Sequence, residues 1–380
     1  MKNKILFITQ DLAVGGGTSS LSALYTAIKN RYDISVFLLA TEGNAIVAYK
    51  DVLVKSNLFT DLYYRNLAKT RGFTRCGSFL AKAVCRIIGT AGFSIDKLHV
   101  KWNKNKLKGY DSVISFGEGV ATSFTQYIDV HPRTAWIHYE VSKYPYRDSF
   151  YNLYKQFDHI VTVSNKIADG LKSIYPELAP KILGIHNIID VERISMLSQA
   201  KISEKFSNNE FNIISLGRLS SVKRFTRIPE IARTIADKGY NIKWRIYGPQ
   251  NDQKELFDLN NNILKYNVSS IVEYCGNRTN PYPYLKNSDL FVILSASEAC
   301  PMVITEARVL NVPFISTDFL TAPEFVDNGV DGIICSIEKI ADNIVDIINN
   351  KSKVLIFLDH SKKRINNNEQ IIQQIESLIV

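Results

Sequence analysis

Short apolar runs alternate along the first half of the chain with stretches whose apolar residues recur at helical spacing. After the first run, Leu21, Leu24, Tyr25 and Ile28 predict an amphipathic helix. The runs have the length and composition of buried parallel strands and end in small or polar residues. The strands expected in this half cover residues 4–9, 34–39, 111–117, 134–139, 159–164 and 181–187.

A second series of the same kind begins after the polar stretch 203–210. Its expected strands cover residues 211–218, 242–248, 270–276, 289–295 and 313–317, and its expected helices cover 224–239, 254–267 and 303–310. Two such series predict two doubly wound α/β domains with a cleft between them and a hinge near residues 190–210. The stretch 366–380 is amphipathic and predicts a final helix.

Composition narrows the class of protein without changing this picture. The 380 residues are 46% hydrophobic and 22% charged, which is typical of a globular protein of two domains. No run of about eighteen apolar residues occurs, so no transmembrane helix is expected. The first apolar stretch is too short for a signal peptide, which predicts a cytoplasmic protein. No cysteine belongs to a C-x-x-C pair, so free thiols are expected at Cys76, Cys85, Cys275, Cys300 and Cys335.

The net charge of +9 is concentrated in residues 65–108. This segment holds eleven Lys and Arg residues and one acid, Asp96, so its charge is +10 (eleven minus one). Such local basicity favours one anionic surface partner. A nucleic-acid partner is not expected, because no reader module is recognisable.

Three clusters carry candidate chemistry. The first, Gly15, Gly16 and Gly17, follows the first strand and precedes a helix, where a ligand can approach the backbone. It lacks the G-x-G-x-x-G spacing of a dinucleotide site, which weighs against a nicotinamide dehydrogenase. In the second cluster, Arg218 ends a strand and Lys223 follows five residues later. Two cations at the carboxyl edge of a sheet can neutralise a diphosphate.

The third cluster surrounds two glutamates, Glu298 and Glu306, after the strand at 289–295. Pro301 lies near the expected helix start, so the amides of 302–304 are expected to be free to hold phosphate oxygens. Eight helical residues span about 12 Å, which exceeds the roughly 5 Å between the carboxylates of a retaining glycosidase. The glutamates are therefore interpreted as ligand contacts rather than as a hydrolytic pair.

The combination G-R-x-x-x-x-K with E-x7-E after a strand resembles the family 4 retaining glycosyltransferases of the GT-B fold. The stretch 280–318 is similar to the donor-binding domain of that family, and 163–194 is similar to its domain-crossing segment. The resemblance is weak between about 45 and 108. It implies two Rossmann-like domains facing each other across a cleft, an acceptor-side domain at 1–195 and a donor-binding domain at 196–361. The last helix, within 362–380, would pack back on the first domain.

The resemblance also implies roles for single residues. Arg218 and Lys223 would hold the donor diphosphate, Glu298 the donor sugar and Glu306 the ribose hydroxyls. His138 would contact the transferred sugar near the reacting centre. The remaining donor contacts expected are Gly15, Gly16, Gly17, Asn277, Arg278, Met302, Val303 and Ile304. Where the family has glycine and an aromatic residue after the first glutamate, Ala299 and Cys300 stand here, so the donor sugar is left open.

The implied reaction is retaining transfer of a sugar from a nucleotide-diphosphate sugar, with UDP-sugars favoured and GDP-mannose as an alternative. No two aspartates stand two positions apart, so no metal and no other cofactor is expected, and fixed cations and helix amides would stabilise the leaving diphosphate. The acceptor expected is a saccharide or a polyprenyl-linked saccharide of bacterial surface glycans such as capsule or lipopolysaccharide. A non-catalytic subunit of the same fold and a sugar-nucleotide epimerase remain the alternatives.

Within residues 75–91, apolar side chains recur at helical spacing beside a basic flank of Arg75, Lys82 and Arg86. A basic amphipathic helix can lie on an anionic bilayer, which predicts peripheral contact with the inner face of the cell membrane. The competing interpretation is an ordinary surface helix whose apolar stripe packs on the domain core. The apolar residues are Phe79, Leu80, Ala83, Val84, Ile87, Ile88 and Ala91.

Overall fold

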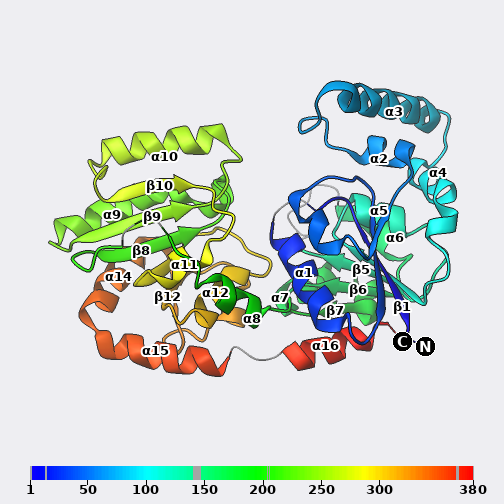
Figure 1. Cartoon of the computed structure of the whole chain (residues 1–380). Helices are drawn as coiled ribbons and strands as arrows, with labels where there is room; N and C mark the ends of the chain where they lie inside the picture. The colour runs from blue at the N-terminus through cyan, green and yellow to red at the C-terminus, as the bar shows by residue number, and fades with distance from the viewer. Residues whose placement is uncertain are drawn as a thin grey trace. The chain divides into compact units, whose positions relative to one another are not determined.

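The computed structural model describes residues 2–12, 15–139, 147–202, 204, 206–364 and 368–379. The chain forms two compact units, each with its own parallel sheet (Figure 1). Unit 1 comprises Met1–Ile188 and Asn368–Val380, and unit 2 comprises Ile189–Asn367. The expectation of two doubly wound α/β domains is confirmed.

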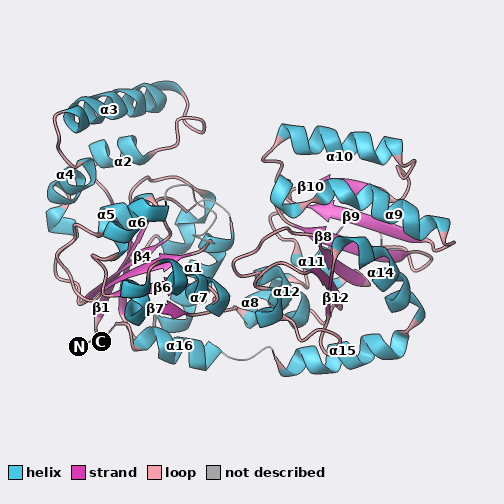
Figure 2. Cartoon of the chain, turned by 180° about the vertical axis from the view of Figure 1, so that it is seen from behind, coloured by secondary structure: helices cyan, strands magenta, loops and turns pink. Residues whose placement is uncertain are grey.

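Unit 1 is built on a seven-stranded parallel sheet in the order β3-β2-β1-β4-β5-β6-β7. Its strands are β1 (Lys4–Thr9), β2 (Asp33–Leu38), β3 (Leu53–Lys55), β4 (Ser112–Phe116), β5 (Arg133–Ile137), β6 (His159–Thr162) and β7 (Ile182–Gly184). Alternate residues of β1 point to opposite faces, and both faces are buried because helices cover them (Figure 2).

The helices of unit 1 are α1 (Gly16–Ile28), α2 (Leu58–Tyr64), α3 (Gly72–Thr90), α4 (Ile95–Trp102), α5 (Val120–Thr125), α6 (Arg147–Tyr154), α7 (Asn165–Ile174) and the C-terminal α16 (Asn368–Glu376). Helix α16 belongs to this unit although it follows the whole of unit 2 in sequence. Arg31 pairs with Glu369 at 3.3 Å and with Glu376 at 3.0 Å, which ties α16 to the end of α1.

Unit 2 has a six-stranded parallel sheet in the order β10-β9-β8-β11-β12-β13. Its strands are β8 (Phe211–Leu216), β9 (Ile242–Tyr247), β10 (Val272–Gly276), β11 (Leu290–Ile293), β12 (Phe314–Thr317) and β13 (Ile333–Cys335). Its helices are α8 (Val191–Leu197), α9 (Ile228–Asp237), α10 (Gln253–Lys265), α11 (Tyr282–Lys286), α12 (Met302–Val309), α13 (Ala322–Phe325), α14 (Ile340–Asn349) and α15 (Lys351–Lys363).

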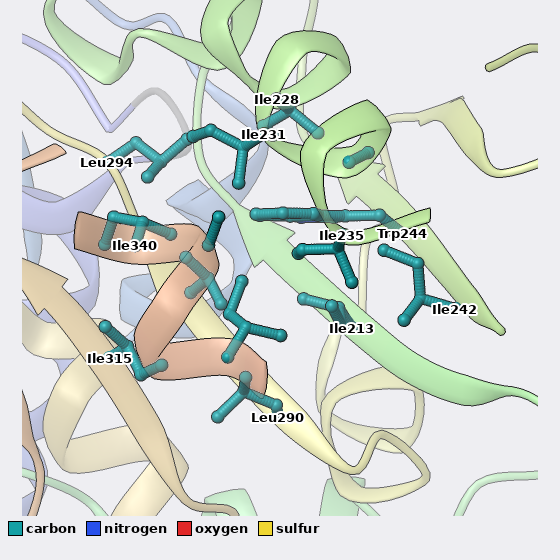
Figure 3. Close-up of a cluster of buried hydrophobic side chains, with 14 of the residues drawn as sticks. Ile213, Ile228, Ile231, Ile235, Ile242, Trp244, Leu290, Leu294, Ile315 and Ile340 are labelled. Atoms are coloured by element: carbon teal, nitrogen blue, oxygen red, sulfur yellow. The ribbon is translucent and has the colours of Figure 1, made fainter. Parts of the chain in front are cut away.

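One face of this sheet carries a large apolar core (Figure 3). Trp244 of β9 lies within it beside Ile235 of α9, and Ile340 of α14 covers the neighbouring strands. The indole Nε1 of Trp244 donates to Ser215 Oγ at 3.1 Å, so the one polar atom of this large side chain is satisfied. The well-packed sheet therefore gives rigid support to the loops at its carboxyl edge.

The strands β3 and β13, of three residues each, were not predicted. Within the described residues, no single helix has the length and apolar character to cross a membrane. Helices α3 and α4 meet that test only as a pair, and they are bent by 119° at the break between them.

Candidate functional site

The carboxyl edge of the unit 2 sheet has a point where the strand order reverses. Strands β8 and β11 are neighbours, and the chain proceeds outward from β8 to β9 and from β11 to β12. Loops that leave such neighbouring strands in opposite directions open a crevice in which α/β proteins bind ligands. The loops that leave here are 217–224 and 294–301, which contain Arg218, Lys223 and Glu298.

Two glycines let the strand ends approach each other closely. Gly217 is the first residue after β8 and Gly248 the first after β9, with φ angles of +150° and +151°. A Cβ on Gly248 would lie 1.8 Å from the carbonyl oxygen of Gly217, so no larger residue fits there. Arg218, next along the loop, is exposed, and among the described residues no carboxylate lies within 4 Å of its guanidinium.

Lys223 and Glu298 meet across the crevice, as expected for two residues of one site. Lys223 Nζ lies 2.5 Å from Glu298 Oε1, and the same carboxylate oxygen accepts from Ser295 Oγ at 2.6 Å. The lysine and glutamate side chains are 18% and 16% exposed, so their attraction is only partly screened by solvent. Lys223 lies in a single 3-10 turn, Ser221–Lys223, before α9 begins at Ile228.

The sequence analysis missed Arg224, which holds the two loops together. Its backbone is left-handed, with φ +51°, and its guanidinium donates to Leu294 O at 2.7 Å and to Ser295 O at 2.8 Å. Thr321 Oγ1 supports the same loop by donating to Glu298 O at 2.7 Å. A lone arginine after the G-R-x-x-x-x-K pattern does not indicate a structural role in the sequence. The role of Arg224 depends on the carbonyl groups of Leu294 and Ser295, about seventy residues away in the chain.

The start of α12 differs from the prediction. The amide of Met302 donates to Cys300 O and that of Ile304 to Pro301 O, both at 2.9 Å. The expectation that these two amides are free to hold phosphate is therefore wrong in this structure, because the turn at Pro301 closes on them. Val303 lies between them at the same helix end.

Glu306, one turn further along α12, is close to an aromatic hydroxyl. Tyr282 Oη donates to its Oε1 at 3.3 Å. Removal of the carboxylate from water raises the pKa of Glu306 to about 7, and the tyrosine hydrogen bond opposes this effect. Glu306 thus titrates near neutral pH, whereas an exposed glutamate does not.

The two donor contacts predicted after β10, Asn277 and Arg278, differ in how far they are already engaged. Asn277 is exposed, but Arg278 is already engaged: it pairs with Glu204 and donates to Cys275 O at 2.7 Å. Its guanidinium also lies 5.5 Å from the ring centroids of Tyr247 and Tyr284. Arg278 therefore fixes the loop after β10 and has fewer free donors for a ligand than the prediction assumed.

In unit 1 the strand order reverses between β1 and β4. Gly15, Gly16 and Gly17 follow β1 at the start of α1, and an added Cβ at any of them would meet no atom of the described residues within 4 Å. The described part of the chain thus leaves space above these glycines. That open space is compatible with close approach of a ligand to the backbone.

His138 is the first residue after β5 and lies beside Glu118, which follows β4 and was not predicted. The His138 amide donates to Glu118 Oε2 at 2.9 Å, and its ring lies 4.7 Å from that of Phe116. Burial lowers the pKa of His138 to about 4 and raises the pKa of Glu118. The imidazole is neutral near pH 7, and its buried Nε2 has no hydrogen-bond partner among the described residues.

An open hollow of about 700 Å³ lies at the same edge of unit 1. Gln10 after β1 and Gly119 after β4 line it, together with Tyr64 of α2 and Lys82 of α3. Polar side chains from the loop after β1, from α2 and from α3 converge there, which is typical of a site that binds a hydroxylated ligand.

No group of three or more His, Cys, Asp or Glu side chains able to hold a metal ion occurs within the described ranges. The five cysteines are free thiols. Burial raises the pKa of Cys275 and of Cys335 to about 11, so these two thiols are not activated.

The family model that matches this chain covers its C-terminal part. Residues 198–370 match the family model of glycosyl transferases group 1. The chain is 28% identical over 194 residues to an uncharacterized glycosyltransferase of Methanocaldococcus jannaschii, covering 50% of this chain and 45% of that protein. It is 28% identical over 204 residues to the capsular polysaccharide biosynthesis glycosyltransferase CapM of Staphylococcus aureus, covering 51% and 53%. The chain thus spans about half the length of these curated relatives.

Solved structures resemble the chain over its whole length. The Anabaena protein HepE in complex with UDP-glucose has a TM-score of 0.72 at 17% identity, covering 99% of this chain and all of that chain. Staphylococcus aureus TarM has a TM-score of 0.76 at 14% identity, covering 100% and 99%. At these identities the likeness concerns the fold, which is the GT-B fold predicted from the sequence.

Proposed function

On the premise that residues 198–370 form a domain of the glycosyl transferases group 1 family, we propose that the protein is a retaining, metal-independent glycosyltransferase. Its donor is a nucleotide-diphosphate sugar and its acceptor a saccharide or polyprenyl-linked saccharide of a bacterial surface glycan. The observation that carries the proposal is the meeting of Lys223 and Glu298 at the strand-order reversal of unit 2.

The donor site proposed in unit 2 uses charge rather than a metal. Arg218 and Lys223 are cations at the carboxyl edge, where a diphosphate would lie. Lys223 is paired with Glu298, so a bound diphosphate would share its ammonium group with that carboxylate. Glu306 would accept hydrogen bonds from the ribose hydroxyls, and the loop at Asn277 would lie beside the base.

In the proposed reaction, the bond between the anomeric carbon and the β-phosphate oxygen breaks as the acceptor hydroxyl oxygen bonds to the same face of that carbon. The acceptor proton passes to the leaving diphosphate, so no protein nucleophile is required. Negative charge grows on the phosphate as the bond breaks, and fixed cations stabilise it most at that moment. Neutral His138, whose Nε2 has no hydrogen-bond partner among the residues that the structure describes, would bind a hydroxyl of the transferred sugar.

UDP is the favoured nucleotide. HepE was solved with UDP-glucose and TarM with UDP, and both have the fold of this chain. GDP-mannose is the alternative. The capsular relative CapM supports a surface-glycan acceptor, for which the hollow in unit 1 offers room. A location on the inner face of the cell membrane, through residues 65–108, completes the proposal.

Proton NMR of the first product formed from an α-linked UDP-sugar and a saccharide acceptor tests the reaction. The proposal predicts an α-glycosidic signal whose rate of appearance is unchanged by EDTA. A β-linked product would contradict retention, and loss of activity with EDTA would contradict metal independence. A changed donor sugar without transfer would identify an epimerase, and no reaction with any donor would favour a non-catalytic subunit.

A further inference from the structure

Helix α3 carries large apolar side chains that face solvent. Phe73 is 98% exposed, Phe79 64%, Leu80 63% and Ile87 70%. Val84 is 44% exposed and, beyond the end of the helix, Phe93 is 62% exposed. Phe73, Leu80 and Ile87 recur at seven-residue spacing and so share one face of the helix, and an exposed apolar face of this kind marks an interaction site more often than a free surface.

The orientation of α3 is fixed by a different set of residues. Ser78, Ala81 and Cys85 are its buried side chains, and the helix packs on α2. Gly77 allows the close approach, because a Cβ there would lie 3.2 Å from Leu62 Cδ1 of α2. The interpretation that the apolar stripe packs on the domain core is therefore wrong. Figures 1 and 2 both show α3 at the margin of unit 1, with α2 between it and the sheet.

The flank of this apolar face is strongly basic. Arg71, Arg75 and Arg86 are exposed, and no carboxylate of the described residues lies within 4 Å of them. The only acid of the segment, Asp96, is occupied by the hydroxyls of Tyr64 and Ser123. The exposed cations of the segment are Lys69, Arg71, Arg75, Arg86, Lys97, Lys101, Lys104, Lys106 and Lys108.

We propose that the outer face of α3 docks on an anionic lipid bilayer, with Phe73, Phe79, Leu80 and Ile87 in the interface and the arginines on the lipid phosphates. The charge of the segment favours a bilayer over a second copy of the chain, because two copies would bring two segments of +10 charge together, and these would repel each other. A polar nucleic acid would leave the apolar face in water. A bilayer with anionic headgroups satisfies both the apolar face and the basic flank.

Docking would also hold a lipid-linked acceptor close to the hollow of unit 1. Lys82 of α3 lines the hollow of unit 1, and its ammonium group donates a hydrogen bond to Tyr63 O. The membrane-facing helix and the proposed acceptor site therefore share a side chain. A lipid-linked acceptor could stay in the bilayer while its saccharide enters the hollow.

The inference deepens the membrane part of the proposed function, but vesicle binding requires neither donor nor acceptor. Flotation of the full chain is measured with vesicles of phosphatidylcholine alone and of phosphatidylcholine mixed equally with phosphatidylglycerol. The test variant combines Phe73→Ser, Leu80→Ser and Ile87→Ser, three exposed positions whose change leaves the core intact. The control combines Phe257→Ser, Leu264→Ser and Met196→Ser, which are equally exposed apolar residues of unit 2.

The wild type and the control are expected to bind the anionic vesicles, and the α3 variant to lose binding by about tenfold or more. Combined Arg75→Gln and Arg86→Gln should reduce the preference for anionic vesicles, whereas Lys254→Gln with Lys351→Gln should not. Transfer to a soluble saccharide should persist in the α3 variant, which separates docking from catalysis. Equal binding to neutral vesicles, unchanged binding of the α3 variant, or self-association that this variant abolishes would each overturn the proposal.

Discussion

Lys223 Nζ lies 2.5 Å from Glu298 Oε1, although the two residues are 75 positions apart in sequence. The pair joins the loop after β8 to the loop after β11, at the one point of the unit 2 sheet where neighbouring strands lead away from each other. The lysine side chain is held by this carboxylate and is only 18% exposed. A diphosphate that enters would thus meet a cation whose position is already fixed, which lowers the cost of ordering it.

Lys223→Ala removes one fixed cation from the proposed diphosphate site. Steady-state kinetics should show kcat/KM reduced by about a hundredfold, or about 3 kcal/mol of transition-state stabilisation. Lys243→Ala is the matched control, because Lys243 also pairs with a glutamate, Glu273 at 3.3 Å. Lys243 lies at the N-terminal end of β9, away from the loops at the carboxyl edge of the sheet. Equal losses in the two variants would mean that only stability is affected.

Glu306 should make donor binding depend on pH. Its pKa of about 7 means that the carboxylate gains its proton as pH falls through neutrality and then accepts ribose hydrogen bonds less well. Calorimetry with a UDP-sugar, whose diphosphate has no ionisation in this range, should show affinity falling severalfold from about pH 8 to about pH 6. Glu306→Gln should bind more weakly at high pH and show no such slope.

The same residue should affect stability in the ligand-free protein. Between the ordinary value of 4.5 and about 7, the folded state binds more protons than the unfolded state. The free energy of unfolding should therefore fall as pH rises through this window, and the slope contributed by Glu306 should vanish in Glu306→Gln. Chemical denaturation at several pH values measures this difference.

Gly248→Ala should disturb the donor loop through the backbone. The new Cβ would collide with Gly217 O, and φ of +151° is unfavourable for alanine. Thermal denaturation should show destabilisation of about 2 kcal/mol or more. Gly239→Ala, also at positive φ but in open space, should cost about 1 kcal/mol, and a similar loss at both positions would argue against the close contact.

His138→Gln should lower kcat by about tenfold or more without changing affinity for the nucleotide alone. Because burial lowers the pKa of His138 to about 4, the wild-type rate should show no ionisation of this residue between about pH 5 and pH 8. Glu118→Gln keeps an acceptor for the His138 amide and should have a smaller effect. His131→Gln, at an exposed histidine paired with Asp158, is the control.

The sequence predicted the sheets well because each buried strand is a distinct apolar run, from Lys4–Thr9 of β1 to Phe314–Thr317 of β12. The resemblance to the family 4 glycosyltransferases also implied that Lys223 and Glu298 share a site. It missed Arg224 and Glu118, whose roles depend on partners that only the fold brings near.

Helix α3 shows a second limit of sequence analysis. Periodicity located its apolar stripe but could not determine whether the stripe faces the core or solvent. The structure turns Ser78 and Cys85 inward and leaves Leu80 and Ile87 outside, because small residues let α3 approach α2 closely. At α12, the amides of Met302 and Ile304 looked free because the turn at Pro301 is not visible in the sequence.

We propose that unit 2 binds a nucleotide-diphosphate sugar through Lys223 and its neighbours without a metal. Thermal denaturation with UDP, GDP, UDP-glucose, UDP-galactose, UDP-N-acetylglucosamine and GDP-mannose, each with and without EDTA, is the measurement that decides this. We expect a Tm rise selective for one nucleotide base, unaffected by EDTA and greatly reduced in Lys223→Ala, since a ligand that binds only the folded state raises Tm. No rise with any of them, a rise that EDTA abolishes, or an equal rise in Lys223→Ala would contradict it.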